Sequence, residues 1–457
     1  MDPSQTNCSL EPSNADSDEK EVISTTNSES KCAEIRSEES GVENLPKSSD
    51  KGCSNEKLPD ERSNENEEIS EKVVDQVESY HGIENPSLVL NPSPASTREI
   101  SSTASQSDNL QAPPPLAAPV TRKPKAHPAV AEPEPFPNPI IRRSHLRKVN
   151  IRITDTIVEQ KLIIHSLSGR FYEIGATLKK AIFGHVIHAI LLKPSESNPD
   201  EFQRTNQQMA IKVYSKRMLR QLQGRTQENP LMEITALQYI GNDHPNLMGQ
   251  IECCTDEENI YSVMRYCQGG ELFDFIDENG PLTNEQAKKM FKQLVNGLAR
   301  LQELGIGHRD MSLENILYDR NEIYVIIDFG MCLRLKKNPE TGEYYFINRQ
   351  QICGKKNYIA PEVLREDPTF NPMIADIWAA GIILFIILTG VPPIDKATHA
   401  DIRYTMICEG RLQEMVNNWG IDMNSEVVDL IQKLLKADPL ERLTIDEILS
   451  HEWMRDA

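Results

Sequence analysis

Residues 306–317 read Ile306-Gly-His-Arg-Asp-Met-Ser-Leu-Glu-Asn-Ile-Leu317, and a second segment soon after reads Ile326-Ile-Asp-Phe-Gly330. The apolar residues that end the first segment and begin the second predict two short buried strands. These strands would hold Asp310, Asn315 and Asp328 at the mouth of one cleft. Three oxygen-bearing side chains in that arrangement suit Mg²⁺, which keeps water and phosphate oxygens as its remaining ligands.

Composition divides the chain of 457 residues into unlike parts. Residues 1–111 are rich in Ser, Glu, Asp and Asn and poor in aromatics, so we expect a disordered acidic arm that cannot bury enough apolar surface to fold. Residues 112–148 are Pro-rich and then basic, which predicts an extended linker. Residues 149–169 predict an added strand or helix that packs on the next domain, and residues 170–454 have the length and composition of one globular domain.

Several classes of protein are excluded by composition. The formal net charge of -20 argues against nucleic-acid binding by the chain as a whole. Nine cysteines without a C-x-x-C pair indicate reduced thiols and no zinc site. The termini carry no signal peptide and no lipidation motif, and the apolar run at residues 377–388 is too short to span a bilayer and predicts a buried core helix.

These exclusions favour a soluble protein of the cytoplasm, with no membrane partner and with the nucleus as the alternative compartment. Basic residues at 122–125 and 142–148 leave nuclear import or an acidic partner surface open beside an ordinary solvated charge run.

Residues 170–454 change in character along their length. Strand patterns at 172–190 and 209–214 surround one helical pattern near 231–240, and the remainder is mainly helical. This order predicts an α+β fold with a small antiparallel-sheet lobe that carries one helix and a large helical lobe. The cleft between two such lobes is a usual place for a ligand.

His308-Arg-Asp310, Asn315 and Asp328-Phe-Gly330 together resemble the catalytic and metal-binding loops of eukaryotic protein kinases. Gln208-Met-Ala-Ile-Lys212 resembles the strand that carries the nucleotide-binding lysine of that family, and Tyr358-Ile-Ala-Pro-Glu362 resembles the end of its activation segment. The resemblance implies a bilobal kinase fold, ATP and Mg²⁺. It also implies transfer of the γ-phosphate of ATP to serine or threonine hydroxyls of protein substrates.

The same resemblance assigns roles in the central loop. Asp310 would accept or orient the proton of the incoming hydroxyl, while Asn315 and Asp328 would hold magnesium. His308 would brace the loop. Two further roles are structural: Glu362 would pair with Arg442, and Asp376 would fix the backbone of the loop.

Nucleotide contacts also follow from the resemblance. Lys212 would grip the α and β phosphates and would be held by Glu233 of the next helix, with Glu228 as the less favoured partner. Met264 would border the adenine, and the alternative role for Met264 is plain core packing. Tyr266 and Cys267 would offer backbone groups to the adenine edge. The remaining contacts expected from the family are Gly184, Val186, Ala210 and, at the ribose, Glu271.

The chain departs from the family in the loop that covers the phosphates. If Gly184 ends this loop, Lys179 and Ala181 stand where the first two glycines belong. A side chain forced into a glycine conformation costs roughly 1 kcal/mol. We therefore expect weakened rather than abolished ATP binding, with Lys179 or Lys180 adding a compensating charge.

A second departure concerns the lysine that Ser/Thr kinases carry two residues after the catalytic aspartate. Here that residue is Ser312, and Leu313 replaces the usual proline. An ammonium about 4 Å from a transferring phosphate is worth about 4 kcal/mol at an effective dielectric near 20, or roughly three powers of ten in rate. The family's Gly-Thr-Pro reads Gly354-Lys355-Lys356, so we hypothesise that Lys355 replaces the lost charge as a catalytic residue. The alternative is a decayed site.

Finer assignments stay open at this point. The segment Gly269-Gly-Glu-Leu-Phe-Asp274 and the closing segments Arg442-Leu-Thr444 and His451-Glu-Trp453 resemble the calcium/calmodulin-dependent group, whereas Ser312 removes a Ser/Thr marker. A pseudokinase scaffold that binds partners through the acidic arm is the main alternative, and a small-molecule kinase is a remote one. Because the chain ends soon after Trp453, we expect regulation through the N-terminal arm or through partners rather than through a calmodulin-released tail.

Kinases of this family are usually controlled by phosphorylation of a residue in the activation segment, and the residue at that position in this chain cannot be phosphorylated. Gln351 replaces the phosphoacceptor, although Arg309 is present to receive a phosphate. We predict that phosphotransfer does not need phosphorylation at the usual position, as measured by activity before and after phosphatase treatment with mass spectrometry of residues 331–352. Loss of activity without loss of phosphate from Thr341, Tyr344 or Tyr345 would contradict this.

Overall fold

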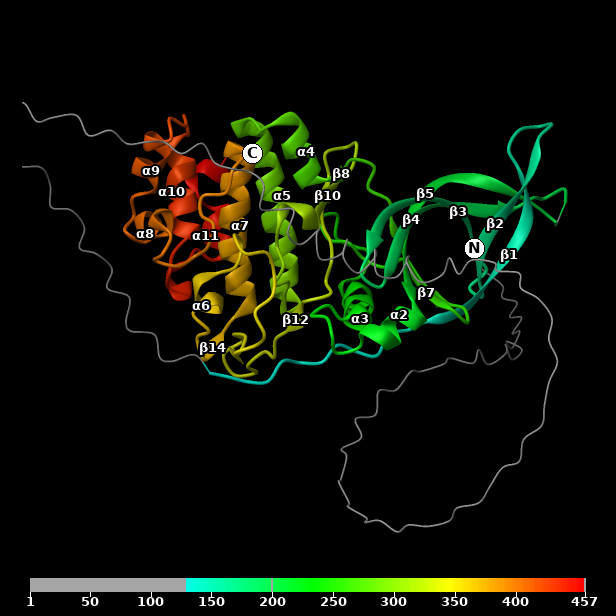
Figure 1. The fold of residues 1–457 in the computed structure, drawn as a ribbon, viewed down its shortest axis with the longest axis horizontal. Coiled ribbons are helices and arrows are strands. Elements are labelled where there is room, and N and C mark those ends of the chain that lie inside the picture. The colour runs from blue at the N-terminus through cyan, green and yellow to red at the C-terminus, as the bar shows by residue number, and fades with distance from the viewer. Residues whose placement is uncertain (1–128, 199, 456–457) are drawn as a thin grey trace, which may run out of the picture. The chain divides into compact units, whose positions relative to one another are not determined.

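The computed structural model describes residues 129–198 and 200–455 (Figure 1). The expected disordered arm of residues 1–111 and residues 112–128 of the expected linker lie outside the described residues. The described chain forms a strand-rich lobe followed by a helical lobe, so the predicted α+β fold of two lobes is confirmed.

Seven strands of the first lobe close into a barrel in the order β1-β2-β3-β4-β5-β7-β6. Its long central strands, β4 and β5, pair antiparallel from Gly184↔Tyr214 to Pro194↔Phe202. Alternate residues of β5 point inward, so Ile211 and Val213 are buried while Lys212 faces the other side. The strands are β1 (Arg142–Arg152), β2 (Val158–Ser166), β3 (Phe171–Ala181), β4 (Gly184–Pro194), β5 (Glu201–Ser215), β6 (Glu252–Thr255) and β7 (Asn259–Arg265).

β1 closes the barrel. It runs antiparallel to β2 and parallel to both β5, at residues 150–152, and β6, at residues 142–143. Residues 142–148, which the sequence assigned to the linker, are therefore part of a strand, and the folded region begins earlier than expected. The buried position in this stretch is Ser144 among exposed basic side chains, so the apolar alternation of a strand becomes visible only at Val149.

Two helices accompany the barrel, α2 (Lys216–Leu222) and α3 (Pro230–Ile240). α3 lies where the sequence predicted a helix. Its first turn is stabilised by Asn229, whose side chain accepts a hydrogen bond from the backbone N–H of Met232, and by Pro230 at the first helical position.

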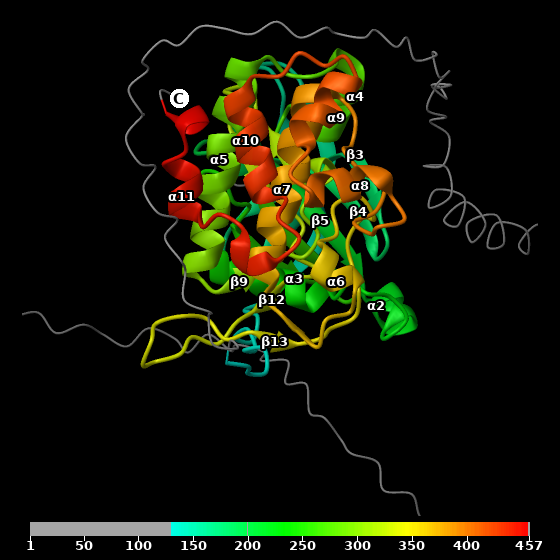
Figure 2. The same cartoon turned by 90° about the vertical axis from the view of Figure 1, so that its left-hand side faces the viewer.

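The second lobe is a bundle around α7 (Pro372–Thr389), which is seen among its neighbours in Figure 2. α7 is apolar on all sides and buried along most of its length, which confirms the prediction of a core helix at residues 377–388. It is also the one helix of the described chain that is long and apolar enough, by length and composition alone, to cross a membrane. The other helices are α4 (Leu272–Asn279), α5 (Asn284–Glu303), α6 (Pro361–Leu364), α8 (Ile402–Cys408), α9 (Leu412–Asn418), α10 (Ser425–Leu434) and α11 (Ile445–Leu449).

The described chain also contains short strands and 3-10 turns. The pair predicted in the central loop is present, because β10 and β11 are antiparallel neighbours with Ile316 opposite Ile326. These elements are β8 (Gly270–Glu271), β9 (Ile306–Gly307), β10 (Ile316–Tyr318), β11 (Tyr324–Ile326), β12 (Leu333–Arg334), β13 (Ile347–Asn348), β14 (Thr369–Phe370), η2 (Leu313–Asn315), η3 (Pro439–Glu441) and η4 (Glu452–Met454).

A buried ion pair joins the end of the activation segment to the C-terminal helices. Arg442 donates to both carboxylate oxygens of Glu362 at 2.7 and 2.5 Å, with both side chains almost fully buried. The guanidinium also lies over the Trp378 ring at 5.3 Å from its centroid. The predicted structural pairing of Glu362 with Arg442 is confirmed.

Candidate active site

The central loop is held to α7 by a single carboxylate. Asp376 accepts hydrogen bonds from the backbone N–H groups of His308, at 2.6 Å, and Arg309, at 2.9 Å. His308 then accepts from the Asp310 N–H through Nδ1 and donates through Nε2 to the carbonyl of Ile327. The loop is therefore fixed by buried groups, as predicted for Asp376 and His308.

The two carboxylate oxygens of Asp310 differ in their hydrogen bonding. Its Oδ2 accepts from Asn315 Nδ2 at 3.0 Å, and the same amide nitrogen donates to the Asp310 carbonyl at 2.7 Å. Its Oδ1 is buried and has no hydrogen-bond partner among the described residues. Burial raises the pKa of Asp310 to about 6, against the opposing charge of Lys355. A buried acceptor without a partner is costly, so a ligand that donates a proton there would be favoured.

Asp328 and Asn315 lie on adjoining segments, because the Ile327 N–H donates to the Asn315 carbonyl at 2.9 Å. Asp328 has a left-handed backbone conformation with φ at 64°, which a non-glycine residue adopts only under constraint. Burial alone would raise the pKa of Asp328, but the charge of Lys212 and the Gly330 N–H outweigh it and hold the pKa below its ordinary value. The ionised carboxylate and the Asn315 amide oxygen left over from its bonds to Asp310 fit a hard divalent ion.

Lys212 is paired with Glu233 and not with Glu228. Its Nζ lies 2.8 and 2.7 Å from the two oxygens of Glu233, and the Tyr214 hydroxyl donates to the same carboxylate at 3.0 Å. Burial would lower the pKa of Lys212, but Glu233 and Asp328 overcome it and raise the pKa, so the lysine stays charged. The pair connects β5 of the barrel to α3.

The residues expected to contact a nucleotide are brought together on three neighbouring strands. Val186 of β4 lies opposite Lys212 of β5, and Ala210 of β5 lies opposite Met264 of β7. Met264 is buried. The other expected residues lie at the ends of strands: Gly184 begins β4, level with the start of β7, whereas Tyr266 and Cys267 follow the opposite end of β7, and Glu271 ends β8.

Glu271 is not isolated, because Lys179 forms an ion pair with it. Lys179 belongs to β3, in the hairpin where Ala181 lies opposite Gly184. Lys179, which stands where the first glycine was expected, therefore reaches Glu271, the residue expected at the ribose. Gly184 has no room for a side chain, since a Cβ there would lie 2.0 Å from the Val213 carbonyl oxygen.

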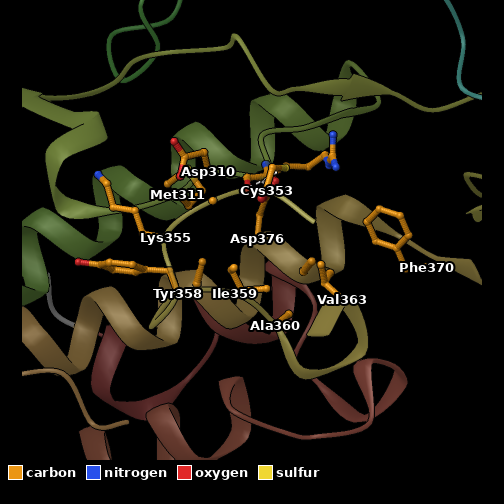
Figure 3. A pocket seen from close by; sticks show the side chains of 14 residues that line it. Asp310, Met311, Cys353, Lys355, Tyr358, Ile359, Ala360, Val363, Phe370 and Asp376 are labelled. Carbon is orange, nitrogen blue, oxygen red and sulfur yellow. Dashed lines mark hydrogen bonds between the residues drawn. The ribbon is translucent and has the colours of Figure 1, made fainter. Parts of the chain in front are cut away.

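Lys355 lies beside the residue that replaces the family lysine. Its Nζ is 2.9 Å from Ser312 Oγ and 3.0 Å from Glu314 Oε2. Figure 3 shows Lys355 and Asp310 on the same side of a pocket that is closed below by Tyr358 and Ala360. The activation segment thus places an ammonium in contact with Ser312, which is the arrangement that the hypothesis of a relocated charge requires.

Sequence reasoning missed the place of two acidic residues in this site. Glu314 anchors Lys355, and Glu228, considered only as a partner of Lys212, lies against Gly330, where a Cβ would be 3.6 Å from Glu228 Cγ. Burial, with the charge of Asp328, raises the pKa of Glu228 to about 7. Glu314 lies within the central loop segment, next to Asn315, and this position could have drawn attention to it, whereas Glu228 belongs to no motif.

Comparisons with known proteins agree with this geometry. A family model described as "Protein kinase domain" matches residues 201–454, more than half of the chain. The chain is 32% identical over 290 residues to CBL-interacting protein kinase 1 of Oryza sativa subsp. japonica, covering 64% of this chain and 57% of that protein. It is 30% identical over 284 residues to CBL-interacting serine/threonine-protein kinase 9 of Arabidopsis thaliana, covering 62% and 58%.

A third relative is Calcium-dependent protein kinase 29 of Arabidopsis thaliana, which is 35% identical over 250 residues, covering 54% of this chain and 44% of that protein. The chain spans little more than half the length of the first two relatives and less than half of this one.

Close approach of the activation segment to Asp310 depends on Gly354. Its φ is 90°, and a Cβ would lie 2.8 Å from the Arg309 carbonyl oxygen and 3.4 Å from Asp310 Oδ1. We predict that Gly354→Ala lowers the free energy of unfolding by about 2–4 kcal/mol, because strain and a backbone clash add. Denaturant melts measure this.

The matched control is Gly342→Ala. Gly342 also has a positive φ, 73°, but no atom of the described chain lies within 4 Å of the position that a Cβ would take. We expect only the strain, about 1 kcal/mol. Equal losses in the two variants would mean that contact with the catalytic loop contributes nothing.

Proposed function

Because the chain belongs to the protein kinase family, we propose that it transfers the γ-phosphate of ATP to serine or threonine hydroxyls of protein substrates. The observation that carries this proposal is the buried, unpartnered Oδ1 of Asp310. The Asp328 carboxylate lies close enough to influence the pKa of Asp310, and the charged Lys212 lies close enough to influence the pKa of Asp328. An acceptor, a fixed ammonium and an anionic metal ligand are the groups that phosphoryl transfer to a hydroxyl requires.

Each residue would contribute a distinct part of the reaction. Asp310 Oδ1 would orient the substrate hydroxyl and accept its proton as the oxygen attacks phosphorus. Lys212, held by Glu233, would bind the nucleotide phosphates. Asn315 and Asp328 would hold Mg²⁺, which when bound supplies positive charge to the phosphate oxygens.

Lys355 would neutralise charge on the transferring phosphate in place of the missing lysine at position 312. Its contact with Ser312 Oγ supports this, and its ion pair with Glu314 holds the ammonium near Asp310. Gly354 lets the backbone come this close. The charge beside the catalytic aspartate is thus kept while its place in the sequence has changed.

The pseudokinase alternative receives no support from the relatives, which are named as kinases. The well-formed Lys212–Glu233 pair and the fixed Asp310 also weigh against it. The altered residues Lys179 and Ala181 would weaken ATP binding without abolishing it, because Lys179 supplies a compensating charge at the mouth of the nucleotide cleft.

Among kinases, we propose the nearest group to be the calcium/calmodulin-dependent one. The relative named Calcium-dependent protein kinase 29 and the segment of residues 270–274 support this. We further propose that regulatory partners act through the N-terminal arm, residues 1–111, which lies outside the family model. A cytoplasmic location, with the nucleus as the alternative, accords with the free thiols of all six cysteines in the described chain.

Phosphotransfer itself is tested with radiolabelled ATP, Mg²⁺ and a generic basic protein. We expect labelling by the wild-type chain and a loss of about 10²–10⁴-fold in Asp310→Asn, which keeps the shape but removes the proton acceptor. Nucleotide binding should be similar in both. Equal labelling by the two proteins, or none by a wild type that binds nucleotide, would reject the function.

Relocation of the lysine is tested by comparing two neighbours. Lys355→Ala should lower kcat by about a thousandfold, because an ammonium near the phosphate is lost. Lys356→Ala removes an exposed charge of the same kind from the next position and should change kcat by less than about threefold.

The double variant Ser312→Lys/Lys355→Ala returns the charge to its usual place and should recover most of the loss. A small and equal effect of Lys355→Ala and Lys356→Ala would show that the site has no need of this charge.

A further inference from the structure

Residues 129–141, which we call the strap, cross the surface from the activation segment to α3 before entering β1 (Figures 1 and 2). The strap precedes the residues matched by the family model. It is rich in proline, with Pro133, Pro135, Pro137 and Pro139, so it loses little backbone entropy when it lies extended on a surface.

At its start the strap pairs with the activation segment. The Ala131 N–H donates to the Phe346 carbonyl, and the Phe346 N–H donates to the Ala129 carbonyl, each at 2.9 Å. Asn348 Nδ2 donates to Glu132 Oε1 at 3.1 Å. Residues 346–348 thereby gain an added strand-like neighbour on one side while β13 pairs with β14.

In its middle the strap holds Arg334 of β12. The Glu134 N–H donates to the Arg334 carbonyl at 2.8 Å. The Arg334 guanidinium lies 3.3 Å from Glu134 Oε2 and donates to the Pro135 carbonyl at 3.2 Å. β12 pairs with β9, which leads directly into the catalytic loop. The strap therefore fixes β12, which follows the Asp328-Phe-Gly330 segment in the chain.

Toward its end the strap contacts α3. The Phe136 ring packs edge-on against Tyr239 with centroids 5.7 Å apart, and Arg334 lies over the same Tyr239 ring at 4.5 Å. Gln238 exchanges two hydrogen bonds with the backbone of Ile140, both at 2.9 Å. Tyr239 and Gln238 lie on the helix that carries Glu233.

The activation segment has no phosphate to organise it at the usual position. Arg309, which would receive that phosphate, donates instead to the backbone carbonyls of Met331, at 3.1 Å, and Gln351, at 2.7 Å. Neutral carbonyls bind a guanidinium more weakly than a phosphate would. The bonds of the strap to Phe346 and Asn348 supply a further anchor for this segment.

We propose that the strap is a positioning element for phosphotransfer: by joining Phe346 and Arg334 to Tyr239 and Gln238, it holds α3 and the activation segment in the arrangement that the active site needs. The proposal rests on the proposed kinase function. Without the strap, α3 would be free to shift and Glu233 would be withdrawn from Lys212 more often. The strap residues act through other groups and touch neither substrate nor nucleotide.

The experiment uses the full chain with two independent disruptions. Glu134→Ala/Phe136→Ala removes the ion pair with Arg334 and the ring that packs on Tyr239. Gln238→Ala removes the side chain of α3 that bonds to the backbone of Ile140. Ile140→Ser is the matched control, because the Ile140 side chain is 61% exposed and its backbone makes the bonds. Each protein is assayed for kcat, for KM of ATP, for thermal unfolding and for amide hydrogen exchange of α3 and residues 343–348.

We expect kcat to fall about tenfold in both disruptions with KM for ATP changed less than about threefold, since fewer molecules have Lys212 and Glu233 paired at any moment. Exchange in α3 and at residues 343–348 should quicken at an unchanged unfolding temperature, and Ile140→Ser should behave as wild type. Unchanged kcat and exchange in both disruptions would overturn the proposal. So would an equal effect of Ile140→Ser.

Two further outcomes are decided by the same data. If one disruption unfolds the protein, the kcat and hydrogen exchange of the other variant decide whether the proposal holds. If the wild type transfers no phosphate, the proposed function fails, while hydrogen exchange still reports whether the strap holds α3 and the activation segment.

Discussion

The ion pair between Lys212 and Glu233 is the interaction on which the active arrangement depends. Removing two charges from water costs several kcal/mol each and is repaid only when their geometry is good and their remaining bonds are satisfied. Here both Glu233 oxygens contact the ammonium, and Tyr214 donates to the same carboxylate. Because the lysine is on β5 and the glutamate on α3, the pair exists only while that helix packs on the barrel. Contacts that hold α3 on the barrel therefore also maintain this ion pair.

A second constraint is electrostatic. The transferring phosphate needs positive charge near the catalytic aspartate, but the physics does not specify which segment of the chain supplies it. Lys355 enters from the activation segment, and Ser312 leaves the space and an oxygen that receives its ammonium. Glu314 then limits its freedom. On the proposed function, the two departures from the family pattern are one compensated change, which the small Ser312 side chain and the absence of a side chain at Gly354 allow.

The short-range parts of the site were predictable from the sequence. Asp310, Asn315 and Asp328 come together because β10 and β11 are adjacent in the chain, so their hairpin needs only a turn to form. The partner of Lys212 was predictable as well, since Glu233 lies on the face of α3 that carries the buried Ile234 and Leu237. Residues 149–152 of β1 fall in the predicted added strand or helix, but the first half of β1 was not predictable, because its one buried residue is Ser144. The course of the strap was also hidden, since most of its anchors are backbone groups that carry no sequence signature.

The sequence by itself determined the chemistry of the loops, because groups a few residues apart on short strands have few ways to be placed. Only the tertiary structure decided which distant segments complete them. Lys355 reaches Ser312 across 43 residues of chain, and Gln238 reaches the strap across 98. Such contacts depend on how whole lobes pack. The free energy that stabilises them comes from many buried side chains and not from the two residues in contact alone, so the identities of those two residues do not reveal the contact.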